Sequence, residues 1–293
     1  MQRAIGARHF DFDRQVAVMA IVNRTPDSFY DKGATFALDK AVDAALAADD
    51  NGADWVDIGG VPFGRGPIVS TQEEIDRIVP LVEAIVSKTD IVISVDTNNS
   101  EVARLSIAAG AAVINDTSGL WDPKMAAVVA DSTANLVLTH SLAPPRSIHL
   151  RPSYADVTAD VVSFLRAKVA EATAAGIPLD RLIIDPGHDL NKNTLHSLEL
   201  TRRLPEIVAL GWPTLVAVSN KDFIGETLGR PKSERLEGSL AVAVACILAG
   251  ARIVRMHDVP AALAAVRMTE AVLGLRDPAY LRHNVVSEGR GAE

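Results

Sequence analysis

The sequence is poor in features that would place it in a specialised class of protein. It contains one cysteine, Cys246, so no disulfide can form within the chain. The apolar run around Cys246 predicts a buried side chain, and the lack of a disulfide framework is typical of a reducing compartment. The opening residues lack the apolar core of a signal peptide, and no apolar run reaches membrane-spanning length. We therefore expect a cytoplasmic protein that does not enter a membrane.

Basic and aromatic residues are also scarce. Lys and Arg number 29 against 37 Asp and Glu, a formal net charge of −8, which argues against a nucleic-acid partner because phosphate binding needs a basic face. Aromatic residues are 4% of the chain while hydrophobic residues are 48%, so aliphatic side chains must fill the core. That composition is typical of parallel strands covered on both faces.

Short β-branched runs alternate with amphipathic helical segments along almost the whole chain. The alternation predicts parallel pairing with right-handed crossovers, and eight such units in roughly 250 residues favour an α/β protein with a single-domain (β/α)₈ TIM barrel. We place the barrel at residues 16–275, an N-terminal segment capping its floor at 1–15, and a C-terminal tail at 276–293. The predicted strands are VAVMAIV (16–22), DWVDIG (54–59), DIVISVD (90–96), AAVIND (111–116), NLVLTH (135–140), RLIIDPG (181–187), TLVAVS (214–219) and ARIVRMHD (251–258).

Polar residues lie at or near the end of each predicted strand. A single such residue is often a turn former or a helix cap. In a TIM barrel, however, the carboxyl ends of all strands face one rim, where the loops build the active site. The whole set therefore predicts a ligand site on that rim: Asn23, Asp57, Asp96, Asn115, His140, Asp185, Ser219 and His257.

Seven motifs mark these strand ends: NRTPDSFYDKG from Asn23, DIGG from Asp57, SVDT from Ser94, INDTSG from Ile114, IDPG from Ile184, SNKDFIG from Ser219 and RMHDV from Arg255. In their order and spacing they resemble the dihydropteroate synthase family. That family joins 6-hydroxymethyl-dihydropterin pyrophosphate to para-aminobenzoate. The resemblance covers nearly the whole chain, so it supports the TIM barrel independently of the strand pattern.

The resemblance implies a pterin site. Asp96, Asn115 and Asp185 would pair with the aminopyrimidinone edge of the pterin, which presents adjacent donors and acceptors. Lys221 would donate to the ring carbonyl and N5 side. Arg255 would stack on the pterin face and reach the pyrophosphate. A pterin or a sulfa-type molecule is therefore the expected ligand.

The resemblance also implies a pyrophosphate site formed by Asn23, Arg255 and His257, with Mg²⁺ coordinated by Asn23. If the chain is active, its catalytic residues would be Asp31, Lys221 and Arg255. In the family, pyrophosphate leaves first and the aniline nitrogen then attacks the cationic pterin methylene. Members of the family generally form dimers, so we expect a homodimer.

The positions that would hold para-aminobenzoate depart from the family pattern. Phe63 and Gly64 stand where the second loop of the family has Thr and Arg. His188 replaces an aromatic residue that forms a wall of the pocket, and Asp189 replaces a glycine. Asp222 replaces a serine that helps hold the aminobenzoate carboxylate. These changes predict an altered aminobenzoate site next to a largely retained pterin-pyrophosphate site.

Asp222 introduces a charge of the wrong sign for an anionic substrate. Two like charges about 4 Å apart repel by roughly 4 kcal/mol at an effective dielectric of about 20, on the order of a thousandfold in affinity. Pairing with Arg65 would weaken this repulsion. Three functions stay open: a paralogue that is inactive or very weak as a synthase, an active dihydropteroate synthase, and a pterin-type barrel repurposed for another acceptor, for example a cationic one.

Overall fold

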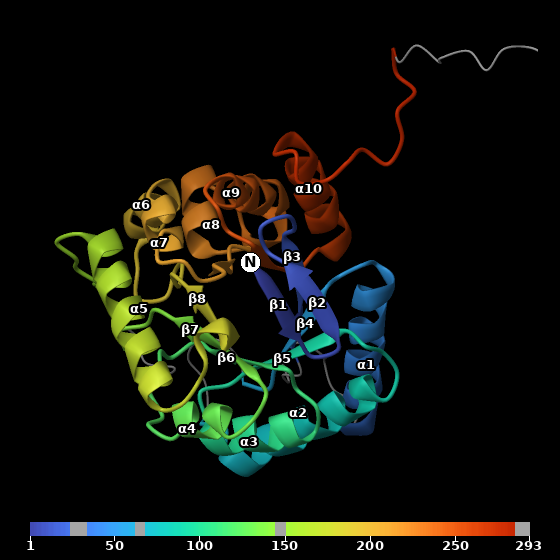
Figure 1. The fold of residues 1–293 in the computed structure, drawn as a ribbon, viewed down its shortest axis with the longest axis vertical. Helices are drawn as coiled ribbons and strands as arrows, with labels where there is room; N and C mark the ends of the chain where they lie inside the picture. Colours follow the sequence, from blue (N-terminus) through green and yellow to red (C-terminus); the bar gives the residue numbers. More distant parts are fainter. Residues whose placement is uncertain (24–33, 62–67, 144–150, 285–293) are drawn as a thin grey trace, which may run out of the picture.

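The computed structural model describes residues 1–23, 34–61, 68–143 and 151–284. Within these residues, eight parallel strands form one sheet in the order β8-β7-β6-β5-β4-β3-β10-β9 (Figure 1). A parallel bridge between Ile184 and Thr214 joins the two end strands, so the predicted TIM barrel is confirmed. The strands are β3 (Ala17–Asn23), β4 (Trp55–Gly59), β5 (Val92–Asp96), β6 (Val113–Asp116), β7 (Asn135–Thr139), β8 (Leu182–Asp185), β9 (Leu215–Val216) and β10 (Ile253–Met256).

Helices surround the barrel (Figure 1). Polar caps start several of them: the side chains of Ser70, Asn99, Asp156 and Asp258 accept hydrogen bonds from the first backbone N–H groups. The helices are α1 (Ala34–Asp50), α2 (Thr71–Val86), α3 (Ser100–Ala108), α4 (Met125–Ala130), α5 (Val157–Ala174), α6 (Thr194–Arg202), α7 (Leu204–Val208), α8 (Asp222–Leu228), α9 (Leu236–Leu248) and α10 (Val259–Val272). No described helix is long and apolar enough to cross a membrane. Cys246 is fully buried in α9, as predicted.

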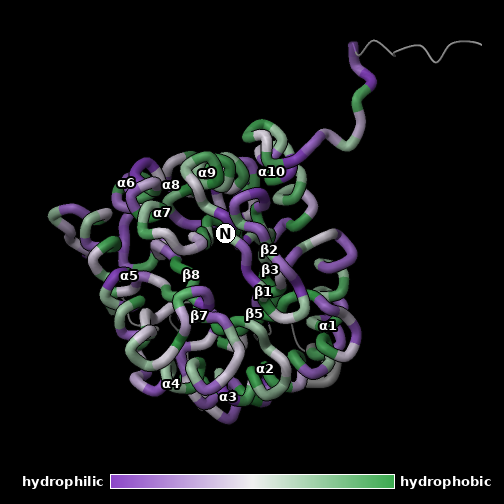
Figure 2. Tube along the Cα trace, in the orientation of Figure 1, coloured by the Kyte–Doolittle hydropathy of each residue, from purple (hydrophilic) through white to green (hydrophobic). Residues whose placement is uncertain are grey.

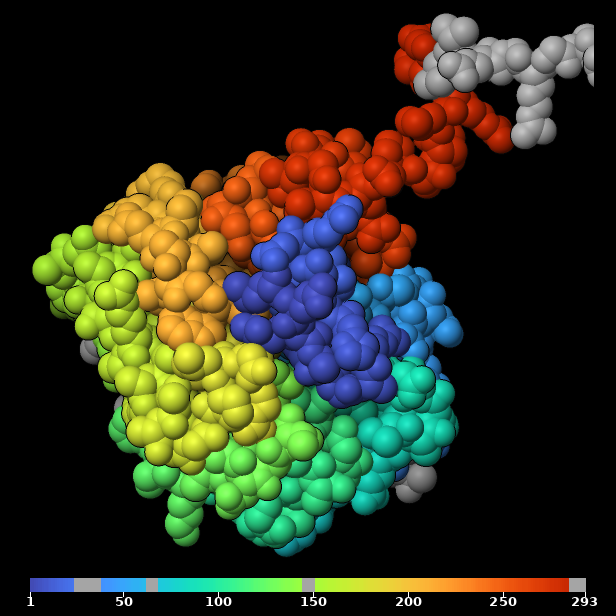
Figure 3. Space-filling view, in the orientation of Figure 1, coloured from blue at the N-terminus to red at the C-terminus, as the bar shows by residue number. Residues whose placement is uncertain are grey.

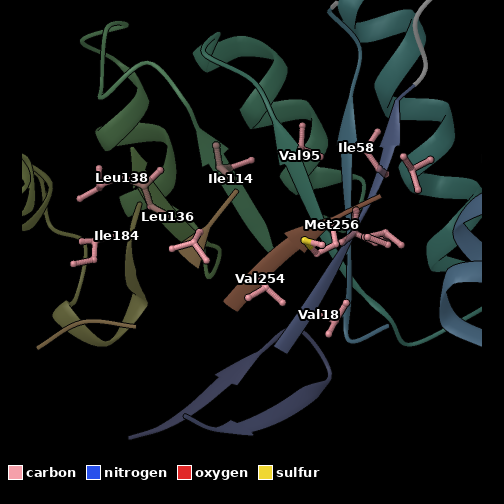
Figure 4. Packing of buried hydrophobic residues seen from close by; sticks show 14 of the residues in the cluster. Val18, Ile58, Val95, Ile114, Leu136, Leu138, Ile184, Val254 and Met256 are labelled. Carbon is pink, nitrogen blue, oxygen red and sulfur yellow. The ribbon is translucent and has the colours of Figure 1, made fainter. Parts of the chain in front are cut away.

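The strand side chains alternate between two environments, because successive residues of a strand point to opposite faces. One set packs outward against the helices, as Val18, Ile58 and Leu136 do (Figure 4). The other set points into the barrel. Its lowest layer is apolar and consists of Met19, Trp55, Val92, Val113, Val137, Ile183, Leu215 and Ile253.

Two residues further along, the inward series becomes polar on six strands. Its members are Asp57, Ser94, Asn115, Thr139, Asp185 and Arg255, and all except Arg255 are buried. The barrel interior therefore has an apolar floor beneath a polar layer that lies toward the carboxyl ends of the strands.

A hairpin of β1 (Gln2–Ile5) and β2 (Arg8–Asp11) covers the opposite end of the barrel. Ile5, Phe10 and Phe12 are buried within the floor cluster. The ring of Phe10 stacks on Phe12 at 5.6 Å and meets Trp55 edge-on at 5.7 Å. In the space-filling view this N-terminal segment lies over the centre of the face (Figure 3). The polar layer consequently faces the carboxyl-end rim.

Candidate functional site

Arg255, on β10, lies at the centre of the polar layer. Its Nε donates to Asp57 Oδ2 at 2.6 Å, and its Nη2 lies 3.4 Å from Asp96 Oδ2. Asp57 is fully buried and also accepts hydrogen bonds from Ser94 Oγ (2.6 Å) and Asn115 Nδ2 (3.1 Å). A buried carboxylate requires such partners because losing water is costly. Asp57 thus links residues of β4, β5, β6 and β10 into one hydrogen-bonded network.

Asp57 is a site residue to which the sequence analysis assigned no role. It was recognised only as a polar strand end within the DIGG motif. Its place in the inward series, two residues after the floor residue Trp55, was the available signal. Because it holds Asn115 and Arg255, Asp57 positions two of the predicted pterin contacts.

Two polar groups of this network can meet a ligand. Asn115 uses its Nδ2 for Asp57, while its buried Oδ1 has no hydrogen-bond partner in the described part of the chain. Such an atom is suited to accept a ligand N–H. Asp96 accepts from Thr117 Oγ1 at 3.3 Å. Burial and the neighbouring Asp57 raise the pKa of Asp96, whereas Arg255 opposes the rise.

Asp185 ends β8 with a side chain that is almost fully buried. Its Oδ1 accepts a 2.7 Å hydrogen bond from the Gly187 N–H. Burial raises the pKa of Asp185 to about 6, although that N–H and the charge of Lys221 oppose the rise. Burial lowers the pKa of Lys221 itself. The carboxylate and amide oxygens can accept from an N–H edge, and the cations Lys221 and Arg255 beside them can donate to a carbonyl or an anion.

Of the residues predicted to contact pyrophosphate, His257 is tied to Ser219, whose Oγ lies 2.8 Å from His257 Nδ1. Asn23 is the last residue of β3 and pairs with Gly59 of β4. Its Oδ1 lies close to the Gly59 backbone, since a Cβ atom added at Gly59 would lie 3.0 Å from it. Asp31 lies outside the described residues. Among the residues that the structure describes, no group of three His, Cys, Asp or Glu side chains could hold a metal. The single oxygen of Asn23 fits Mg²⁺ only if water and phosphate supply most of its ligands.

On the other half of the rim, Asp189 adopts a left-handed conformation with φ +64°. Its Oδ2 accepts hydrogen bonds from the backbone N–H groups of Asp222 (2.6 Å) and Phe223 (3.5 Å), the first residues of α8. Its Oδ1 accepts from Ser197 Oγ at 3.2 Å. The carboxylate that stands where the sequence analysis expected a glycine therefore accepts from the first N–H groups of α8 and caps this helix.

Asp222 carries a side chain that is 87% exposed, and its Oδ1 pairs with Arg235 Nη1 at 2.9 Å. The repulsion that the sequence analysis expected between Asp222 and an anionic substrate is therefore too large, because water and Arg235 screen the charge of Asp222. The partner expected from the sequence, Arg65, lies outside the described residues, as do Phe63 and Gly64.

His188 keeps an aromatic ring where the sequence suggested that a wall is lost. The ring is buried, stacks on Phe223 with 5.9 Å between centroids, and has its Nε2 3.1 Å from Thr201 Oγ1. Burial lowers the pKa of His188 to about 3, so the imidazole is neutral. It packs the loop against α6 and α8, with almost no surface left for a ligand.

Comparisons with known proteins agree with this geometry. Residues 19–257 match the family described as pterin binding enzyme. The chain is 46% identical over 284 residues to the inactive dihydropteroate synthase 2 of Mycobacterium leprae, covering 95% of this chain and 97% of that protein. It is 39% identical over 261 residues to the dihydropteroate synthase of Escherichia coli, covering 89% and 93%.

A solved structure has the same fold. The dihydropteroate synthase of Xanthomonas albilineans in complex with 7,8-dihydropteroate superposes with a TM-score of 0.84 at 38% identity. The match covers 93% of this chain and 99% of that one.

Proposed function

The chain belongs to the family of pterin-binding enzymes that includes the dihydropteroate synthases, and we propose that it is a divergent paralogue that binds a pterin and has little or no synthase activity. The observation that carries the proposal is the division of the rim. The strand-borne polar residues form a connected acceptor network, whereas a carboxylate already occupies the first N–H groups of α8. In the same proposal, residues 16–275 are the pterin-binding barrel, 1–15 its floor and 276–293 a tail.

The pterin half supports binding. In the proposal, Asp96, Asn115 and Asp185 accept from the N–H groups of the pterin edge, while Lys221 and Arg255 face its carbonyl and pyrophosphate sides. A ligand lacking an N–H group at this position would leave the buried Oδ1 of Asn115 without a partner, which is costly, so the network favours a pterin-like edge. The same recognition would admit a sulfa-type molecule only weakly, because such a molecule belongs on the altered half.

The aminobenzoate half argues against turnover. Asp189 holds the N–H groups of Asp222 and Phe223, so a substrate carboxylate arriving there would displace it or meet its charge. The exposed carboxylate of Asp222 adds a second negative charge, reduced by Arg235. An acceptor bearing a cation would meet neither penalty. The two carboxylates, Asp189 and Asp222, therefore make a barrel repurposed for a cationic acceptor the second candidate.

Any remaining synthase chemistry would use the pyrophosphate residues. We assign Asn23, Arg255 and His257 to the pyrophosphate and Asn23 to Mg²⁺, which would supply charge stabilisation for the leaving anion. Arg255 would hold negative charge at the same end of the pterin, and Lys221 would donate to the ring. Asp31 completes the predicted catalytic set, although its position lies outside the described residues.

Calorimetry tests the proposal. The protein is titrated with 6-hydroxymethyl-dihydropterin pyrophosphate in the presence of Mg²⁺ and then with para-aminobenzoate. We expect measurable heat when the pterin is added to the wild type, weaker binding of the pterin to Asp185→Asn, and no heat for para-aminobenzoate. Tight binding of both ligands would contradict the loss of the second site. Absence of pterin binding would contradict the retained one.

We also propose a homodimer in the cytoplasm. The last two helices expose apolar side chains: Leu248 of α9 is 55% exposed, while Met268 and Val272 of α10 are 64% and 68% exposed. The tube of α9 is hydrophobic along much of its length (Figure 2). Light scattering should find a dimer that Met268→Asp with Val272→Asp converts to a monomer. Leu228→Asp, at a half-exposed site of α8, is the control that should leave the dimer intact.

A further inference from the structure

Lys192, in the loop between β8 and α6, is a buried lysine that the site described so far does not use. Only 7% of its surface is exposed. Its Nζ donates three hydrogen bonds: to His140 Nδ1 at 2.8 Å, to the Gly187 carbonyl at 2.9 Å and to the Leu190 carbonyl at 2.9 Å. None of these acceptors is a carboxylate. Burying an ammonium group without a directly paired carboxylate is costly. A function of the buried Lys192 is therefore to be sought among the residues around it.

The turn that Lys192 holds also carries Asp185. The Gly187 N–H donates to Asp185 Oδ1 at 2.7 Å, while the carbonyl of the same residue accepts from Lys192. Gly187 has φ +68°, and a Cβ atom there would lie 2.3 Å from the His140 carbonyl oxygen. The turn is therefore pressed against the end of β7, and Lys192 clamps it to the His140 ring.

We propose that Lys192 is the positioning residue of the pterin site. Its buried ammonium group fixes the Asp185–Gly187 turn against His140 and adds to the positive charge of Lys221 and Arg255 that favours the ionised Asp185 carboxylate. The inference rests on the proposed function only in taking Asp185 as a ligand contact. The clamp and the charge effect are properties of the protein without ligand.

The charges around Lys192 agree with this role. Burial lowers its pKa to about 7, against the attraction of Asp185 and Asp189 and together with the repulsion of Lys221. Its positive charge in turn opposes the rise that burial causes in the pKa of Asp185. Three imidazoles lie near Lys192, and burial is the main cause that lowers the pKa of each: His140 (about 2), His188 (about 3) and the partly exposed His196. They are neutral at neutral pH, so they add no positive charge beside Lys192.

A titration of Asp185 without ligand tests the inference directly. The carboxyl ¹³C resonance of Asp185, assigned with Asp185→Asn, is followed by NMR in the wild type, Lys192→Met and Lys192→Arg. We expect Lys192→Met to raise the midpoint by on the order of one pH unit, and Lys192→Arg to leave it near the wild-type value. An unchanged midpoint in folded Lys192→Met would overturn the charge role. If Lys192→Met does not fold, Lys192→Gln takes its place.

The pH dependence of binding separates positioning from a general structural role. Affinity for 6-hydroxymethyl-dihydropterin pyrophosphate is measured by calorimetry from acidic to neutral pH. In Lys192→Met the acid limb should move to higher pH, and Lys192→Arg should restore it. An affinity that falls equally at every pH would make the residue merely structural and overturn the inference. A wild type that binds no pterin would refute the proposed function instead, while the NMR titration would still decide the role of Lys192.

Discussion

The two halves of the rim differ in what their polar side chains hold. In the pterin half, the side chains lie on strands and pair mainly with one another, as Asp57 does with Arg255 and Asn115. In the aminobenzoate half, they lie on a loop and at the start of α8, and Asp189 pairs with the backbone of that helix. In the first half, loss of Arg255 would leave the buried Asp57 without its cation. A change in the second alters a loop while the barrel stays intact, so a substrate site can disappear there without loss of the fold.

The comparison predicts its largest effect at Arg255. In Arg255→Met the buried Asp57 would lose its cation, at a cost of about 3–5 kcal/mol in the free energy of unfolding. Chemical denaturation measures the loss. The double variant Asp57→Asn, Arg255→Met, which removes both charges, should recover part of it. If Arg255→Met lowers the free energy of unfolding by less than about 1 kcal/mol, the Asp57–Arg255 pair is solvated. The polar side chains of the pterin half would then depend on one another no more than those of the aminobenzoate half.

Asp185→Asn should have the next largest effect, and of opposite sign. The pKa of folded Asp185 is raised from 3.8 to about 6, so its burial costs stability increasingly as the pH rises through this interval and fully above it. That difference corresponds to on the order of 3 kcal/mol. Asparagine can still accept from the Gly187 N–H. The variant should therefore be more stable than wild type at neutral pH, with the gain vanishing below about pH 4.

The same variant should bind the pterin more weakly, since an amide cannot replace a charged acceptor. Denaturation at two pH values and calorimetry check both effects. The raised pKa of Asp185 would be contradicted if the free energy of unfolding of the wild type, relative to that of Asp185→Asn, rose between acidic and neutral pH.

A smaller effect is expected at Asp189. Asp189→Gly keeps the left-handed backbone but removes the cap of α8, which should cost about 1 kcal/mol. Asp189→Asn, which keeps an oxygen acceptor, is the matched control and should cost less. Equal stability of all three proteins in denaturation would show that the carboxylate is not a helix cap and is available to a ligand.

The smallest effect is expected at Asp222. Because its side chain is 87% exposed, Asp222→Ser should change stability by no more than about 0.5 kcal/mol. Alone it should not restore binding of para-aminobenzoate. Asp189→Gly combined with Asp222→Ser should increase binding by about tenfold or more. Full recovery in the single variant would place the whole defect on Asp222 and refute the part given to Asp189.

The sequence was sufficient for the barrel because each strand carries a local pattern. The eight strands and the polar strand ends follow from periodicity, although β9 is only Leu215–Val216 where residues 214–219 were expected. The roles of Asp57 and Asp189 could not be read in this way. Each depends on a partner far away in the chain, Arg255 for the first and the start of α8 for the second.

Two other contacts required the structure for the same reason. Asp222 pairs with Arg235, thirteen positions along the chain, which no local pattern indicates. Lys192 is buried against His140 at the end of β7 although its neighbours in sequence are polar, so no local pattern singled it out. Motifs identified the family and predicted its pterin residues, and tertiary contacts reveal which substituted residues have structural partners.

The most direct test of the account is the rate of dihydropteroate formation by the purified protein. It is supplied with Mg²⁺, 6-hydroxymethyl-dihydropterin pyrophosphate and para-aminobenzoate, beside the Escherichia coli relative under identical conditions. The account predicts no product, or a trace far below the rate of that relative, from a protein that calorimetry shows to bind the pterin. Dihydropteroate formed at a rate comparable to that of the Escherichia coli protein would contradict it.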